Sequence, residues 1–211
     1  MYLAKHIDDV LEGKKSKLLG TSGYYKFVST LNRAFNQKDL KFKFESFADI
    51  EKDFYSVSGL YDMSKDTRYV VLNFSDRTLD ITLKEDSWND FKFFISQVIQ
   101  HESIHQNQWI QREEVVDSLD CDFKILFGSS NKEEEMDYLS DPDEIDAYAH
   151  DIAMEIKYFY PKKDPYNVLK NINKLRKIPS FSIYKKTFRG YEWDDIKKGL
   201  LLKTYKWIPY A

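Results

Sequence analysis

The sequence predicts an α+β fold, because the spacing of its hydrophobic residues changes twice along the chain. Apolar residues recur with the helical period over residues 2–35, alternate with polar residues over 40–83, and return to the helical period from residue 88 onward. Of 211 residues, 42% are hydrophobic and 16% aromatic, against only 7 glycines and 5 prolines. This composition excludes disordered and fibrous proteins and indicates a folded domain.

The N-terminal segment, residues 1–36, is expected to be helical. Residues 2–19 read as an amphipathic helix that ends near Gly13 or among the lysines after it, and residues 24–35 continue with helical spacing. Over 40–84 we expect a small antiparallel or mixed sheet. Its four candidate strands, separated by turn-forming residues, are 40–44, 54–61, 69–74 and 79–83.

A long helix is predicted over residues 88–116, with Ser87 as its N-cap. Its first turns are apolar on nearly every side, which is typical of a helix in the middle of a domain. An acidic, irregular stretch follows over 117–139. A second helix is expected over 142–160, since proline suits a first helical turn and Pro161 prevents continuation.

The tail, residues 161–211, is expected to add two or three short helices. We expect residues 1–160 to form one domain, with the tail as a basic helical extension packed on it. The net charge of −3 hides an asymmetry, because residues 162–211 carry +9 and residues 1–161 carry −12. A solvated basic layer over an acidic body explains this, and so does an anionic partner such as nucleic acid, although the sequence contains no nucleic-acid-binding motif.

The single cysteine, Cys121, cannot form an internal disulfide, and the charged N-terminus does not resemble a signal peptide. No segment approaches the roughly 20 apolar residues that cross a bilayer. We therefore expect a cytoplasmic protein without a membrane partner.

The pattern His101-Glu102-Ser103-Ile104-His105 lies inside the long helix. Four residues is just over one turn, so both imidazoles leave one face and can share a metal ion, while Glu102 can reach a water on it. A chance match with hydrogen-bonded core histidines is the alternative. Burial of these groups would cost several kcal/mol unless they were paired or metal-bound, which favours a metal site that needs a third ligand.

With this motif, the chain resembles the zincin metallopeptidases, in particular the gluzincin-like branch and small phage-encoded zinc peptidases. The resemblance covers roughly residues 55–155. It rests also on Gly59-Leu60-Tyr61, on Val70-Val71-Leu72-Asn73 and on the segment 138–149, which looks like a P-x-E-I-x-A-x-A helix. It implies a zincin-like fold with a strand that a peptide lies against, Zn²⁺ held by His101, His105 and Glu144, and Glu102 as general base. For a phage protein the compartment would be the host cytoplasm.

The role of Glu144 as the third ligand has two competing interpretations. Asp141 and Glu144 also have the spacing of a capping box, in which the glutamate only starts a helix, and His150 is a rival ligand. Known gluzincins carry an acidic residue four positions after the ligand glutamate, where this chain has Tyr148. The residues that could orient the zinc histidines instead are Asp146, Asp151 and Asp117.

The expected function is that of a zinc-dependent peptidase acting on a peptide or protein. Glu102 would move the proton, and Tyr148 or His150, with Tyr138 a weaker candidate, would donate a hydrogen bond to the oxyanion. For each of these three a core or surface aromatic is the alternative. Two other functions remain open: a non-catalytic zincin-fold protein, such as a viral structural or host-interacting factor whose metal is structural or lost, and a nucleic-acid-binding module that rests on the tail alone.

Overall fold

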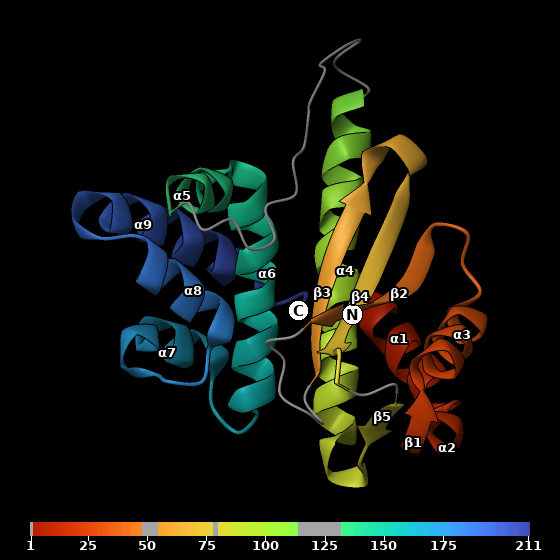
Figure 1. Ribbon diagram of the computed structural model, residues 1–211. Helices are drawn as coiled ribbons and strands as arrows, with labels where there is room; N and C mark the ends of the chain where they lie inside the picture. Colours follow the sequence, from red (N-terminus) through yellow and green to blue (C-terminus); the bar gives the residue numbers. More distant parts are fainter. Residues whose placement is uncertain (1, 48–54, 78–79, 114–131) are drawn as a thin grey trace. The chain divides into compact units, whose positions relative to one another are not determined.

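The computed structural model describes residues 2–47, 55–77, 80–113 and 132–211, and its fold is α+β (Figure 1). The small mixed sheet and the helical C-terminal part are confirmed. The chain divides into two compact units, Met1–Trp109 and Ile110–Ala211. The expected domain boundary after residue 160 stays a prediction, and it differs from this division.

The first unit begins with three helices: α1 (Tyr2–Glu12), α2 (Lys15–Leu18) and α3 (Tyr24–Phe35). One helix was expected over 2–19, but a turn at Gly13 and Lys14 separates α1 from α2. The Gly13 N–H still bonds to the Asp9 carbonyl oxygen at 3.1 Å, and the Lys14 N–H makes a tighter bond to Leu11 at 2.9 Å. The helix at 24–35 is confirmed.

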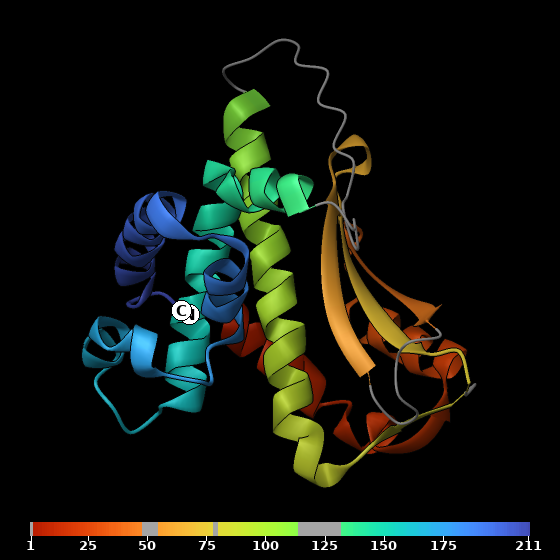
Figure 2. The ribbon, with the colours of Figure 1, turned by 60° about the vertical axis from the view of Figure 1, so that its left-hand side comes forward.

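The main sheet has three strands in the order β2 (Leu40–Phe47), β4 (Thr67–Ser75), β3 (Tyr55–Asp62) (Figure 2). Strand β4 pairs in parallel with β2 and antiparallel with β3, so the sheet is mixed. Because β4 is the central strand, it is buried almost throughout, whereas β3 is an edge strand. The turn from β3 to β4 contains the 3₁₀ helix η1 (Met63–Lys65).

A second, two-stranded sheet was not expected. Strand β1 (Gly20–Gly23) pairs antiparallel with β5 (Asp80–Leu83). The predicted strand at 79–83 therefore exists over its described residues but belongs to this separate sheet. The sequence of β1, Gly-Thr-Ser-Gly, has no hydrophobic alternation that would mark it as a strand.

Helix α4 (Trp88–Glu113) follows the 3₁₀ helix η2 (Glu85–Ser87). Ser87 donates its hydroxyl to the Lys84 carbonyl oxygen at 3.0 Å. Apolar residues of α4 join α1, α3 and the inner face of the main sheet in one hydrophobic core, and those of the helix are Trp88, Phe91, Ile95 and Ile99. The predicted end at 116 lies outside the described residues.

The second unit is helical: α5 (Lys132–Ser140), α6 (Pro142–Phe159), α7 (Pro165–Lys170), the 3₁₀ helix η3 (Ile172–Lys174), α8 (Pro179–Thr187) and α9 (Gly190–Trp207). Helix α6 runs through its core, where apolar residues of α5, α7, α8 and α9 meet. The helix expected over 142–160 is confirmed, and α9, with 18 residues, is longer than the short helices expected for the tail. Within the described residues, no helix has both the length and the apolar character needed to cross a membrane.

Candidate metal centre

His101 and His105 face each other on α4. Their Nε2 atoms lie 3.2 Å apart, and the ring planes are inclined at 70°. Two nitrogens that bind Zn²⁺ at about 2.0–2.1 Å with a tetrahedral angle are separated by roughly 3.3 Å. The pair therefore has the separation that one shared zinc ion requires, and both rings are half-buried.

Gln108 orients one ring of this pair. Its Oε1 lies 3.0 Å from Nδ1 of His105. An amide oxygen only accepts hydrogen bonds, so Nδ1 carries the proton and Nε2 presents its lone pair toward His101. Such second partners fix the tautomer of metal-binding histidines. Sequence reasoning missed Gln108, although its place three residues after His105 puts it on the same helix face.

Glu102 lies about 100° around the helix from His101, on the side of the main sheet, and is only 6% exposed. It packs against the edge strand β3 at Gly59. A Cβ atom added to Gly59 would come 2.1 Å from Oε1 of Glu102, far inside any normal contact. Glycine at this position is what lets the carboxyl group fit between the helix and the strand.

Arg68 of β4 reaches the motif from the sheet. Its Nη1 donates to the Ser103 hydroxyl at 2.6 Å, and that hydroxyl donates to the Ile99 carbonyl oxygen at 2.6 Å. The guanidinium also forms an ion pair with Asp39. Arg68 is itself buried, so its hydrogen bond to Ser103 fixes where the motif lies along the central strand β4.

Asp66 makes a second link, from the β3–β4 turn to α4. Its Oδ1 accepts hydrogen bonds of 2.8 Å from the Gln106 amide and from the Tyr61 hydroxyl. These two bonds, the one from Gln106 first, hold the pKa of the Asp66 carboxyl below its usual value. Asp66 has a left-handed backbone, with φ of 45°, which turns the chain into β4. The residue after His105 is thereby tied to the sheet.

Glu144 belongs to the second unit and lies in the first turn of α6, where it is 5% exposed. Asp141 caps this helix by accepting the Asp143 N–H at 2.7 Å. A capping box would also bring the Asp141 N–H to Glu144, but this N–H is donated to the Tyr138 carbonyl oxygen at 3.2 Å. In a capping box the Glu144 carboxylate would accept the Asp141 N–H, whereas here the Tyr138 carbonyl oxygen accepts it.

Tyr148 follows Glu144 by four residues, on the same face of α6. Its ring packs edge-on against Tyr184 of α8, with 5.4 Å between centroids. Burial raises the pKa of the Tyr184 phenol, so that group stays protonated at physiological pH. Tyr148 is therefore an aromatic packed against the core of its unit, and its role as oxyanion donor stays a prediction.

His150 is turned about 240° around α6 from Glu144. It is 4% exposed and packs edge-on against Trp207 of α9, with 5.1 Å between centroids. Its Nδ1 lies 3.9 Å from an Asp151 carboxylate oxygen.

Asp146 accepts a hydrogen bond from the Trp207 indole at 3.1 Å, which ties it to α9. Of the other sequence-based candidates, Tyr138 is exposed and Asp117 lies outside the described residues.

Comparison with known proteins gives no match to a family model, a curated protein or a solved structure.

Proposed function

We propose that the chain is a zinc-dependent peptidase in which His101, His105 and Glu144 hold one zinc ion and Glu102 is the general base. The observation that carries the proposal is the histidine pair, whose Nε2 atoms lie 3.2 Å apart beside a buried glutamate. A zincin-like fold, a peptide or protein substrate and a reducing compartment such as the cytoplasm belong to the same proposal.

The donor set fits zinc. His101 and His105 of the first unit would each give one imidazole nitrogen, and Glu144 of the second unit would give a carboxylate oxygen. Two imidazoles and one carboxylate are a known ligand set of catalytic zinc, which leaves the fourth position for water or substrate. Gln108 supports the assignment, because it fixes His105 in the tautomer that leaves Nε2 able to bind.

When bound, the zinc ion lowers the pKa of water and polarises a carbonyl group. Glu102 then accepts a proton from the attacking water and passes it to the leaving amine. Its position between α4 and Gly59 of β3 favours this task, because the close packing holds the carboxyl group in one place. Tyr148 would donate a hydrogen bond to the developing oxyanion.

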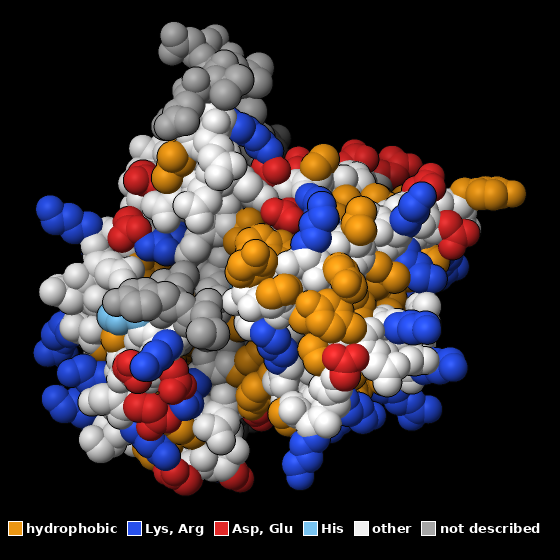
Figure 3. All heavy atoms as spheres, turned by 180° about the vertical axis from the view of Figure 1, so that it is seen from behind, with side chains coloured by type: hydrophobic (Ala, Val, Ile, Leu, Met, Phe, Trp, Pro, Cys, Tyr) orange, Lys and Arg blue, Asp and Glu red, His pale blue; other side chains and the backbone are white. Residues whose placement is uncertain are grey.

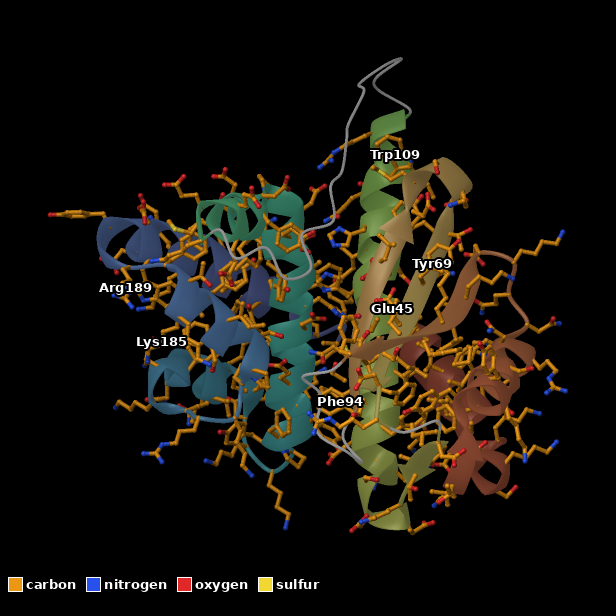
Figure 4. All side chains as sticks on the ribbon, in the orientation of Figure 1. Glu45, Tyr69, Phe94, Trp109, Lys185 and Arg189 are labelled. Atoms are coloured by element: carbon orange, nitrogen blue, oxygen red, sulfur yellow. The ribbon has the colours of Figure 1, made fainter. Side chains whose placement is uncertain are left out.

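Glu102→Gln tests the proposal directly. The zinc-loaded variant should cleave a mixture of quenched fluorescent peptides about 10²–10⁴-fold more slowly than the unaltered chain, with unchanged zinc content. Glu45→Gln, an exposed change on β2, is the matched control and should leave the rate unchanged (Figure 4). Full activity of Glu102→Gln would remove Glu102 from the mechanism. Absence of any hydrolysis by the zinc-loaded chain would overturn the peptidase proposal in favour of a non-catalytic role.

A further inference from the structure

A groove of about 600 Å³ lies in the second unit between α7, η3 and α9. Its floor is aliphatic and includes Leu169 and Ile172, both buried in the core of this unit, together with Leu201. It contains none of the candidate metal ligands. The inference drawn from it is therefore independent of the proposed peptidase function.

The rim of the groove exposes large hydrophobic side chains. Leu202 is 57% exposed and Tyr205 is 56% exposed, and Tyr166 stands beside them with its ring 4.8 Å from that of Tyr205. Scattered exposed hydrophobic residues are common, but several around one groove are typical of a binding surface. Figure 3 shows hydrophobic side chains gathered on the second unit, with both basic and acidic side chains around them.

Two lysines give the groove its charge. Lys170 of α7 and Lys198 of α9 both line it and are exposed, and among the described residues no acidic side chain lines it. On α9, Lys198, Leu202 and Tyr205 follow one another at intervals of four and three residues, so a cation and two hydrophobic groups lie along one side of the helix. The surrounding tail, residues 162–211, carries a net charge of +9.

We propose that this groove binds an acidic amphipathic helix of a partner protein. The apolar face of such a helix would pack on Leu201 and Leu202 of α9, and its carboxylates would pair with Lys170 and Lys198. Single-stranded nucleic acid would need aromatic faces open for base stacking. The floor here is aliphatic, and the two rim tyrosines pack on each other, so the groove favours a peptide.

The probe is a fluorescein-labelled 15-residue helical peptide with leucine at i, i+3, i+4 and i+7 and glutamate at the flanking positions. Fluorescence anisotropy with the full chain should show saturable binding. The same peptide with lysine in place of every glutamate should bind at least about tenfold more weakly, because like charges repel across the rim.

Paired variants locate the site. Lys170→Glu with Lys198→Glu should weaken binding of the acidic peptide at least about tenfold, while Lys185→Glu with Lys186→Glu, exposed changes on α8, should change it less than about twofold (Figure 4). Leu202→Ser tests the apolar contact and should also weaken binding.

The proposal is overturned if the acidic peptide fails to bind, if both peptides bind equally, or if both charge-reversal pairs have the same effect. Tighter binding of a single-stranded oligonucleotide, or self-association that Leu202→Ser abolishes, would also overturn it.

Discussion

Helices α4 and α6 both carry histidine and glutamate side chains that are buried or half-buried, but these side chains meet different partners. On α4, His101 and His105 turn their Nε2 atoms toward each other at 3.2 Å. On α6, His150 packs against the indole of Trp207, and Glu155 accepts the N–H and hydroxyl of Ser180 at the start of α8. Similar residue types therefore have different partners in the two units.

Burial alone therefore does not identify a functional group. A buried carboxylate is stable when it satisfies the free N–H groups of a helix terminus, as Glu155 does. On α4, by contrast, two imidazole Nε2 atoms lie at hydrogen-bond distance from each other and Gln108 contacts one of the rings, an arrangement that the proposed zinc site would use.

Glu155→Ala should have the largest effect on stability, because it leaves the start of α8 without its buried acceptor. We expect the free energy of unfolding to fall by about 3 kcal/mol, measured by chemical denaturation, with zinc content unchanged. Glu192→Ala, an exposed change in the first turn of α9, is the control and should cost less than about 0.5 kcal/mol. Loss of zinc without loss of stability would reverse the roles assigned to the two helices.

Gly59→Ala should disturb the α4 site by forcing Glu102 away from β3. The added Cβ would lie 2.1 Å from Oε1, so we expect a cost of about 2 kcal/mol in unfolding free energy. Gly199→Ala on α9 is the matched control. A Cβ there meets no atom within 4 Å, and alanine should stabilise the helix by up to about 1 kcal/mol. Equal effects of the two changes would contradict the close approach of Glu102 to the strand.

Gln108→Ala should weaken zinc binding without removing a ligand. Loss of the hydrogen bond to His105 is expected to lower zinc affinity about 10–100-fold, measured by competition with a chelating dye. Gln106→Ala, two residues earlier, removes a bond to Asp66 and should leave the affinity unchanged. If Gln106→Ala had the larger effect, the orientation of His105 would not depend on Gln108.

Asp66→Asn should give the smallest effect, and that effect should depend on pH. The pKa of Asp66 is lowered in the folded chain, so its carboxylate stabilises the fold above the unfolded value near 3.8, and this contribution is lost as the pH falls through the folded pKa. The variant should therefore be less stable than the unaltered chain at pH 7, and the difference should shrink in acid. A difference that grew as the pH fell would contradict the two hydrogen bonds to the carboxylate.

The sequence predicts the elements better than the contacts between them. The two periods of hydrophobic spacing locate α3, α4, α6 and the four strands β2 to β5, because apolar side chains recur in each with the period of a helix or a strand. They miss β1, whose four small residues pair through the backbone, and they join α1 to α2 across Gly13.

For the candidate site, spacing within one helix was enough to place His101 and His105 together. It could not show that Gly59 admits Glu102, or that Arg68 reaches Ser103, because both contacts depend on how the sheet is set against α4. The sequence also could not decide whether Glu144 takes part in a capping box, because that depends on the backbone bond from the Asp141 N–H to the Tyr138 carbonyl oxygen.

The zinc site is tested by the zinc content of the purified, untagged chain, measured for the unaltered protein beside Glu144→Ala and His150→Ala. We expect about one zinc ion per chain in the unaltered protein, nearly none in Glu144→Ala, and full content in His150→Ala, whose ring packs against Trp207. Zinc that persists in Glu144→Ala but disappears from His150→Ala would show that the third ligand has been assigned to the wrong side of α6.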